Sequence, residues 1–345
     1  MKAAVLEKVN QLRVKDVPKP ALDQDEILVQ IAYCGICGTD IKLYQGKYSA
    51  NVPVILGHEY AGTVVEIGKA VSKVAVGDRV VPDPNESCGA CYWCRSGKPC
   101  FCTNLAAYGV LRDGGFAEYA KLRERGAYRI PAGLDYDGAC FTEPVSCAVH
   151  CIDRAAVQPA ETVVIIGGGP MGQILVQLVS SSASPAKVVL VSRSTWKLDM
   201  AKGFGAAEVI NATSEDVGER VRALTDDRGA DVVIEAVGTP QTIEQAIGLA
   251  KKSGRVVIFG FVPEGQTARF VPFEVLSKEL TIMGSWVNPY TFERALQALA
   301  GGQVAVAPLV SEVVTLDGID KGFQYMSEQP QGFMKALVRV GGGGV

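Results

Sequence analysis

The chain has 345 residues, of which 48% are apolar and 21% are charged, and its formal net charge is −3. This composition is typical of an ordinary globular protein of about two domains, and it gives no reason to expect nucleic acid or an anionic membrane as a partner. No apolar run approaches a membrane span, and the N-terminal stretch "MKAAVLEKVNQLRVKDVPKP" is unlike a secretory signal. We therefore expect a cytoplasmic protein.

The first 150 residues or so show mostly alternating apolar and polar positions. Examples are "EILVQIAYC", "AGTVVEIG", "VGDRVVP" and "GGFAEYAKL". Short alternating runs separated by Gly, Pro and Asp predict antiparallel strands of a barrel or sandwich.

From about residue 155 the apolar runs become continuous and alternate with helical patterns. "TVVIIGGGP", "AKVVLVS", "ADVVIEAVG" and "GRVVIFGFV" are the apolar runs. Strands that are buried on both faces and are each followed by a helix predict a doubly wound parallel sheet. The remainder, after "ELTIMGSW", predicts a helix or two and a closing strand "KALVRV".

The first of these runs ends in a glycine-rich turn with the pattern G-x-G-x-x-G, formed by Gly167, Gly169 and Gly172. The first glycine would allow the tight turn, the second a close approach of a pyrophosphate, and the third the packing of helix on strand. The free N–H groups at the start of the helix would face the phosphates. The alternative is a strand–helix turn in some other α/β protein.

The end of the next strand indicates which dinucleotide binds. In an NAD-binding fold, a carboxylate at the end of this strand binds the ribose 2′-hydroxyl. Here that position is Ser192, which is followed by Arg193 and, one turn later, by Lys197. Two cations and no carboxylate favour NADP. The alternative is a solvated Arg193, with NAD bound through Ser192.

Ten cysteines in a chain with no export signal suggest metal-binding or buried thiols rather than disulfides. Four of them have the spacing C-x2-C-x2-C-x7-C, which suits a closed, tetrahedral structural zinc site: Cys88, Cys91, Cys94 and Cys102. An iron–sulfur cluster or buried thiols are the alternatives. Cys100 lies in the same loop and is interpreted as a bystander.

A second metal site could involve His58, one of only two histidines. Catalytic zinc takes three protein ligands and keeps one position open, and Cys37, His58 and Glu143 are candidates. Sequence spacing does not show that they meet. A histidine hydrogen-bonded in a turn is the simpler reading of His58, and Cys34 with Cys37 could form a redox C-x-x-C pair, although no thioredoxin-like pattern surrounds them.

Together, several short stretches resemble the zinc-containing medium-chain dehydrogenases of the sorbitol and polyol dehydrogenase kind. They are "CGICGTD", "GHEYAG", "VGDRV", the four-cysteine loop, "GGFAEY", "EPVSCAVH", "GGGPMG" and "EAVG". The resemblance covers essentially the whole chain. It implies a GroES-like β-rich catalytic domain at 1–152, completed by 286–345, and a Rossmann dinucleotide-binding domain at 153–285.

The resemblance also implies roles for individual residues. Cys37 and His58 match ligands of the catalytic zinc, and Glu59 and Glu143 match the carboxylates that ligate it or hold its water. Asp40 would orient the zinc-bound histidine, and Thr39 would take the proton of the substrate. The remaining matches are Met171, near the pyrophosphate, and four residues that line the nicotinamide half: Phe259, Gly260, Phe261 and Trp286.

The implied activity is oxidation of a polyol hydroxyl to a ketone with hydride transfer to NADP, by a tetramer or dimer. Vicinal diols, threonine-like amino alcohols and simple secondary alcohols are rival substrates, and a non-catalytic nucleotide-binding relative is an alternative of another class. The chain departs from its relatives at Lys42, where many have a relay histidine, and at Val287 and Asn288, where sorbitol dehydrogenases have Arg and Tyr. We interpret His150 as structural.

Overall fold

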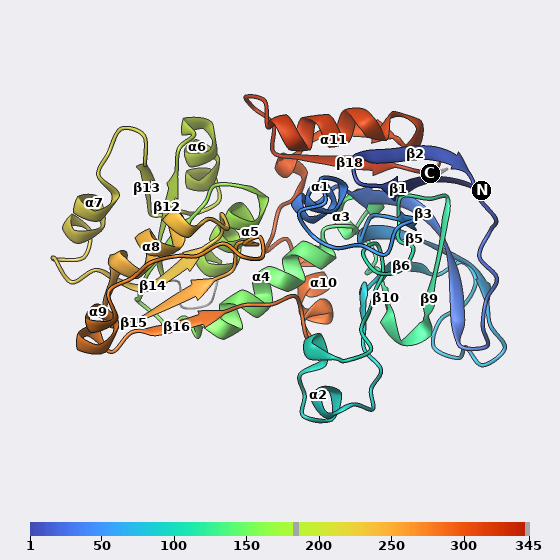
Figure 1. Ribbon diagram of the computed structural model, residues 1–345, viewed down its shortest axis with the longest axis horizontal. Helices are drawn as coiled ribbons and strands as arrows, with labels where there is room; N and C mark the ends of the chain where they lie inside the picture. The colour runs from blue at the N-terminus through green and yellow to red at the C-terminus, as the bar shows by residue number, and fades with distance from the viewer. Residues whose placement is uncertain (182–185, 342–345) are drawn as a thin grey trace. The chain divides into compact units, whose positions relative to one another are not determined.

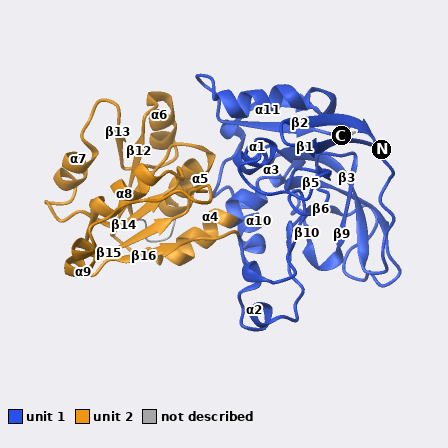
Figure 2. Cartoon of the chain, viewed as in Figure 1, with its two compact units in different colours: residues 1–146, 288–345 blue, residues 147–287 orange. Residues whose placement is uncertain are grey.

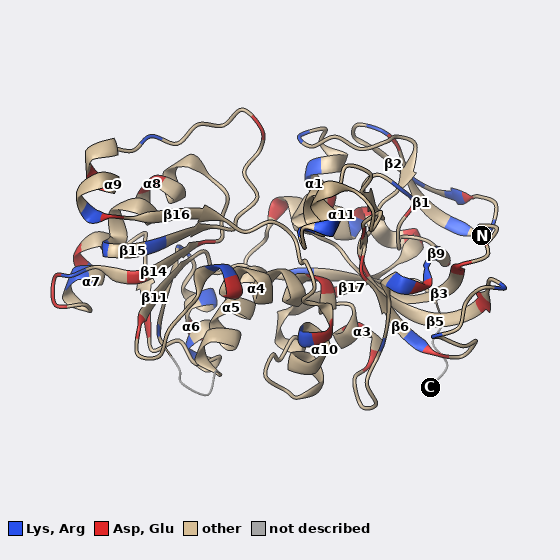
Figure 3. Cartoon of the chain, turned by 90° about the horizontal axis from the view of Figure 1, so that it is seen from below, with Lys and Arg blue, Asp and Glu red and all other residues tan. Residues whose placement is uncertain are grey.

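The computed structural model describes residues 1–181 and 186–341, which form two compact units. Unit 1 comprises residues 1–146 and 288–345, and unit 2 comprises residues 147–287 (Figure 2). Basic and acidic positions are interspersed along the chain of each unit (Figure 3). No helix within the described residues has the length and apolar character needed to cross a membrane.

Unit 1 is built mainly from antiparallel strands (Figure 1). One sheet has the order β2–β1–β4, and a larger one has the order β10–β6–β5–β3–β18–β17, with β9 also paired to β3. Strands β7 (Asn85–Glu86) and β8 (Ala106–Ala107) form a separate pair. The strands of the two larger sheets are β1 (Lys2–Lys8), β2 (Gln11–Asp16), β3 (Glu26–Gly35), β4 (Val54–Ile55), β5 (Glu59–Ile67), β6 (Arg79–Pro82), β9 (Tyr119–Arg123), β10 (Ala127–Arg129), β17 (Val310–Thr315) and β18 (Lys335–Arg339).

The alternating pattern of the sequence places alternate residues of β3, namely Ile27, Val29 and Ile31, in one core of this unit. The helices of the unit are short. They are α1 (Gly38–Tyr44), α2 (Tyr92–Arg95), α3 (Tyr136–Ala139), α10 (Phe292–Ala300), α11 (Ile319–Glu328) and the 3-10 turns η1 (Pro99–Phe101), η2 (Glu124–Gly126), η3 (Ala307–Leu309) and η4 (Leu316–Gly318).

The chain returns to unit 1 at Asn288 and adds two strands to the large sheet. Strand β18 pairs antiparallel with β3, with Leu337 opposite Gly35, and parallel with β17. Gly35 in turn lies opposite Glu59 of β5. The C-terminal strand is therefore brought next to segments that are about 300 residues earlier in the chain.

Unit 2 contains a six-stranded parallel sheet with the order β13–β12–β11–β14–β15–β16. The strand order reverses between β11 and β14, and ligands of such sheets bind at this switch point, beyond the carboxyl ends of the strands. The elements are β11 (Thr162–Ile166), β12 (Lys187–Ser192), β13 (Glu208–Asn211), β14 (Ala230–Glu235), β15 (Ala250–Ile258), β16 (Thr281–Gly284), α5 (Pro170–Ser180), α6 (Thr195–Gly203), α7 (Val217–Ala223), α8 (Pro240–Leu249) and α9 (Pro272–Lys278), while α4 (Thr142–Ala155) runs from unit 1 into unit 2.

The continuous apolar runs become the central strands of this sheet. Successive residues of β11, including Val163, Val164 and Ile165, are fully buried, as strands covered on both faces require. The predicted fold class, a β-rich domain with a doubly wound parallel sheet, is confirmed.

Candidate functional site

The four predicted zinc cysteines meet in the loop around α2. The sulfur atoms of Cys88, Cys91, Cys94 and Cys102 all lie within 4.8 Å of one another. The Sγ of Cys94 lies 4.0 Å from that of Cys88 and 3.5 Å from that of Cys91. A tetrahedral zinc ion with Zn–S bonds of about 2.3 Å needs sulfur separations of about 3.8 Å, so this loop fits the ion. Cys100 is not among the four.

Backbone N–H groups point at these sulfurs. The N–H groups of Ala90 and Cys91 donate to Cys88 Sγ at 3.5 and 3.4 Å. Backbone donors lower the pKa of Cys91 to about 6, whereas burial raises the pKa of Cys102 to about 11. Zinc binds thiolates, so donors that stabilise the charged form of the sulfur also favour metal binding.

The predicted catalytic group is partly assembled within unit 1. One ligand atom each from Cys37, His58 and Glu59 lies within 4.8 Å of the others. Cys37 is the residue before α1, and Glu59 is the first residue of β5, directly after His58. One sulfur, one imidazole nitrogen and one carboxylate oxygen are a donor set that suits zinc with an open position.

Asp40 connects these segments from a fully buried position. Its Oδ2 accepts from the backbone N–H of Cys37 at 2.8 Å, its Oδ1 accepts from that of Gly57 at 3.3 Å, and Oδ1 lies 3.5 Å from His58 Nδ1. Burial lowers the pKa of His58, but the charges of Asp40 and Cys37 outweigh burial and raise it well above its usual range. The surroundings of His58 therefore stabilise positive charge, which a divalent cation would supply.

Lys335 also lies at this site, although no sequence pattern singles it out. Its Nζ lies 2.6 Å from Glu59 Oε2, and it donates to the carbonyl of Ile36 at 3.1 Å. Both charged side chains are almost completely buried. Burial lowers the pKa of Lys335, but the charge of Glu59 outweighs it and the pKa is raised overall, so the lysine remains a cation that holds one oxygen of Glu59.

Two further predicted residues lie on α1. Thr39 is half-buried one position before Asp40. Lys42, in place of the relay histidine of many relatives, is also half-buried, and burial lowers its pKa.

Glu143 is not part of the compact group around His58 and lies in the first turn of α4. Its negative charge acts on Asp83, whose pKa is raised to about 7 by burial first and then by Glu143. The buried Asn288 joins this polar region: its Nδ2 donates to Ser146 Oγ at 2.9 Å, and its Oδ1 accepts from Asn85 Nδ2 at 2.8 Å. A direct role of Glu143 as a metal ligand stays a prediction.

The glycine-rich turn of unit 2 has the backbone that its spacing predicts. Gly167 has a positive φ of 121°, and α5 begins after Gly169. A Cβ on Gly169 would meet no atom within 4 Å, so space is open there for a ligand to approach. A Cβ on Gly172 would lie 1.8 Å from the carbonyl oxygen of Gly167, so only glycine permits this packing of helix on turn. Met171 is half-buried in the first turn of α5.

The residues of the ribose slot lie beside this turn. A Cβ on Gly168 would lie 2.8 Å from Ser192 Oγ and 3.2 Å from Lys197 Cβ. Arg193 is exposed, and the pKa of Lys197 is lowered by burial first and then by the charge of Arg193. Two cations that repel one another at this end of β12 form an environment that suits an anion.

The residues predicted for the nicotinamide half follow β15 and β16. Phe259, Gly260 and Phe261 are half-buried and directly follow β15. The rings of Phe261 and Trp286 lie 6.4 Å apart between centroids, at 33° to one another, and Trp286 is partly exposed.

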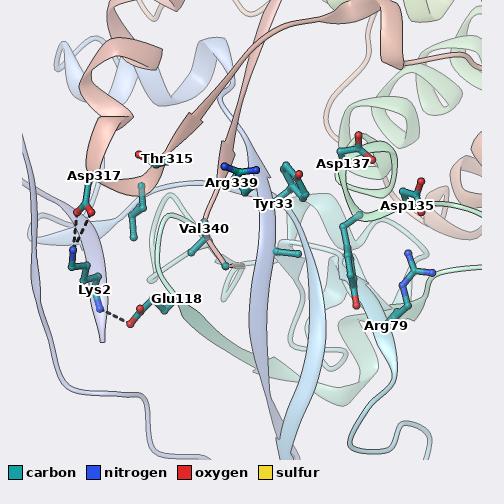
Figure 4. A pocket seen from close by; sticks show the side chains of 14 residues that line it. Lys2, Tyr33, Arg79, Glu118, Asp135, Asp137, Thr315, Asp317, Arg339 and Val340 are labelled. Atoms are coloured by element: carbon teal, nitrogen blue, oxygen red, sulfur yellow. Dashed lines mark hydrogen bonds and ion pairs between the residues drawn. The ribbon is translucent and has the colours of Figure 1, made fainter. Parts of the chain in front are cut away.

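Unit 1 also contains a pocket of about 1000 Å³ that includes none of the predicted site residues (Figure 4). Lys2 lies in it and pairs with Asp317 at 3.0 Å, while its backbone N–H donates to Glu118 at 2.8 Å. Side chains of both charges line the pocket.

Two protein families match the sequence. The family described as "Alcohol dehydrogenase GroES-like domain" matches residues 23–132, and the family described as "Zinc-binding dehydrogenase" matches residues 170–301.

Curated relatives and solved structures match over almost the whole chain. D-arabinitol dehydrogenase 1 of Uromyces fabae is 33% identical over 332 residues, covering 95% of each chain. L-threonine 3-dehydrogenase of Bacillus subtilis (strain 168) is 34% identical over 318 residues, covering 90% of each. A zinc-binding dehydrogenase of Sinorhizobium meliloti 1021, solved with NADP bound, has 38% identity and a TM-score of 0.92, covering 98% of each chain.

Proposed function

Because the chain belongs to the zinc-containing medium-chain dehydrogenase family, whose members include polyol dehydrogenases, we propose that it oxidises a secondary hydroxyl of a polyol to a ketone and transfers the hydride to NADP. The broader activity follows from the family: the protein is an NAD(P)-dependent oxidoreductase that acts on CH–OH groups. The choice of polyol and of NADP is our proposal.

The observation that carries the proposal is the group of Cys37, His58 and Glu59, with one ligand atom of each within 4.8 Å of the others; His58 and Glu59 are buried and Cys37 is half-buried. Zinc held there would supply Lewis-acid chemistry, which makes a nearby alcohol easier to deprotonate. Asp40 Oδ1 lies 3.5 Å from His58 Nδ1, and we propose that this carboxylate orients the ring so that Nε2 would bind the metal.

The protein must also remove the proton of the hydroxyl while the hydride goes to the nicotinamide. We assign the first transfer to Thr39, whose hydroxyl can accept a hydrogen bond from the alcohol and donate another in turn. Lys42, one helical turn further along α1, can donate to a ribose hydroxyl, and as an ammonium group it has no lone pair with which to accept the proton.

The polar character of the site supports a hydroxyl-rich substrate. Glu59 and Glu143, rather than a second cysteine, provide the remaining charged groups of the proposed site, and Asp83 adds another carboxyl group near Glu143. Carboxyl groups can accept hydrogen bonds from several hydroxyls at once. Because similar identity is shared with a polyol and a threonine dehydrogenase, the substrate has to be measured.

The first test is a panel of initial rates on zinc-loaded protein. Pentitols, hexitols, butanediols and threonine are each tried with NADP and with NAD. We expect a polyol with NADP to have the highest kcat/KM. A higher value for a butanediol or for threonine would contradict the polyol assignment and leave the dehydrogenase activity in place.

The cofactor is tested separately with the double variant Arg193→Ala/Lys197→Ala. A charge-assisted hydrogen bond contributes about 1.5–3 kcal/mol, so we expect KM for NADP to rise about tenfold or more, with KM for NAD nearly unchanged. Lys202→Ala, on the same helix α6, is the matched control. Equal effects on NADP and NAD would contradict a 2′-phosphate site.

We further propose that the protein is a dimer or tetramer that assembles through unit 2. Four apolar residues in and just before α9 are more than half exposed: Phe270, Val271, Phe273 and Leu276. Exposed apolar patches of this kind are typical of protein–protein interfaces.

A further inference from the structure

Glu235 is a buried carboxylate for which the proposed chemistry has no use. It is the last residue of β14, and its side chain is fully buried. Its Oε1 accepts from the backbone N–H groups of Val237 and Gly238 and from the hydroxyl of Thr242, each at 2.8 Å. Its Oε2 has no hydrogen-bond partner among the described residues. A buried charge is costly, so its place here calls for an explanation.

These contacts hold the turn between β14 and α8. Val237 and Gly238 form the turn itself, and Thr242 lies in the first turn of α8. Thr242 also shares a hydrogen bond of 2.8 Å with the hydroxyl of Thr239, the residue before α8. One carboxylate oxygen therefore fixes both the turn and the start of the helix.

The same turn packs backbone against backbone on the turns that follow β11 and β15. A Cβ on Gly238, whose φ is +85°, would lie 2.3 Å from the carbonyl oxygen of Phe261, and a Cβ on Gly260 would lie 2.2 Å from the backbone nitrogen of Gly238. A Cβ on Gly167 would lie 3.1 Å from the carbonyl oxygen of Ala236. The three turns are thus packed closely against one another.

Glu235 also binds the third turn through its backbone. Its carbonyl oxygen accepts from the N–H groups of Phe259 and Gly260, at 2.9 and 2.8 Å, and Ala236 N–H donates to Ile166 O at 2.9 Å. The turns that follow β11, β14 and β15 are therefore all connected to Glu235, either directly or through the neighbouring Ala236.

We propose that Glu235 is a positioning residue for the dinucleotide: it sets the three turns against which the pyrophosphate and the nicotinamide half bind. The proposal rests on the proposed function and on the predicted positions of the pyrophosphate, at Gly167 to Gly172, and of the nicotinamide half, at Phe259 to Phe261. The adenosine half, at Ser192 and Arg193, follows β12, which lies on the other side of β11 from β14. Loss of Glu235 would therefore affect one half of the dinucleotide far more than the other.

The test compares Glu235→Ala with Glu235→Gln. Alanine removes the acceptor of three hydrogen bonds, whereas glutamine keeps an acceptor oxygen with two lone pairs on a side chain of the same length, without the charge. We expect Glu235→Ala to weaken NADPH binding about tenfold or more, and Glu235→Gln to bind within about threefold of the wild type. If alanine prevents folding, Thr242→Val, which removes one of the three donors, should give a smaller loss in the same direction.

A second ligand distinguishes positioning from general damage. Adenosine 2′,5′-bisphosphate carries only the adenosine half, so calorimetric titration should give nearly the same Kd with the wild type and with Glu235→Ala. The matched control is Asp231→Ala, at the other end of β14, where the carboxylate accepts from Thr162 N–H at 2.8 Å and pairs with Lys251. It should lower Tm and leave both Kd values unchanged.

Unchanged NADPH binding by Glu235→Ala, or equal losses for NADPH and for the adenosine fragment, would overturn the inference. Failure of the wild type to bind either NADPH or NADH would instead contradict the proposed function. If the wild type binds NADH more tightly than NADPH, NADH replaces NADPH and AMP replaces adenosine 2′,5′-bisphosphate. The same results then support or overturn the inference.

Discussion

At the scale of single residues, the ion pair of Lys335 and Glu59 is the most unusual contact of the site. Two opposite charges 2.6 Å apart are almost completely removed from water. Removing one partner of such a pair leaves an uncompensated buried charge, which costs about 3–5 kcal/mol. We expect Lys335→Met to lower the free energy of unfolding by about this amount, measured by urea denaturation with saturating zinc.

The control for this prediction is the double variant Lys335→Met/Glu59→Gln. It removes both charges, so it should be destabilised clearly less than Lys335→Met alone. If the double variant is destabilised by the sum of the two single effects, the pair is not coupled and the interpretation of Lys335 is wrong.

The same residues show what the sequence could and could not reveal at this scale. Cys37 and His58 occur in short motifs, so a metal site could be suggested from local patterns. Lys335 lies in the strand "KALVRV", where nothing distinguishes it from an ordinary surface lysine. Its role depends on the pairing of β18 with β3, which brings together segments about 300 residues apart. Asp83 is not distinguished by a sequence pattern either. Burial and the charge of Glu143, which lies about 60 residues later in the chain, raise its pKa, and both depend on the folded structure.

At the scale of elements, the four-cysteine loop has almost no core of its own. Its aromatic residues Tyr92, Trp93 and Phe101 remain exposed to a considerable degree and pack mainly on one another, with ring centroids 5.2 and 5.6 Å apart. A zinc ion bound by the four cysteines would then supply much of the folding free energy of the loop. We expect Cys91→Ser to lose about one zinc per chain, measured by elemental analysis, and to become sensitive to trypsin after the exposed Arg95.

The matched control in the same loop is Cys100→Ser. Its sulfur is not among the four that meet, so this variant should keep its zinc and its resistance to trypsin. Zinc loss from Cys100→Ser, or full zinc in Cys91→Ser, would contradict the assignment of the four ligands.

The elements themselves could be predicted well where the chain is periodic. The continuous apolar runs identify the strands of the parallel sheet because burial on both faces leaves no polar positions. Strand order is a different matter: the placement of β14 next to β11 depends on how the chain crosses over, which no local pattern encodes. The contacts of Glu235 were not predictable either, because the stretch "EAVG" does not show that the carboxylate of its glutamate accepts hydrogen bonds from the backbone N–H groups of the turn.

At the scale of the whole molecule, the surface of unit 2 predicts self-association. Phe273 and Leu276 of α9 are 72% and 73% exposed. Strand β16 pairs only with β15 within the described chain and ends the six-stranded sheet. An unpaired strand edge and an adjacent apolar helix are the two features that a second copy of the chain could cover together.

The double variant Phe273→Glu/Leu276→Glu tests this prediction. Burial of apolar area contributes about 25 cal/mol per Å², and two carboxylates in the interface would add a desolvation cost, so the assembly should dissociate. We expect light scattering to give a multiple of 36.6 kDa for the wild type and a smaller mass for the variant. Val76→Glu replaces a residue of unit 1 that is 61% exposed and lies outside this patch, so it should leave the mass unchanged. A wild type that is monomeric at micromolar concentration, or a variant with the wild-type mass, would show that α9 is not the interface.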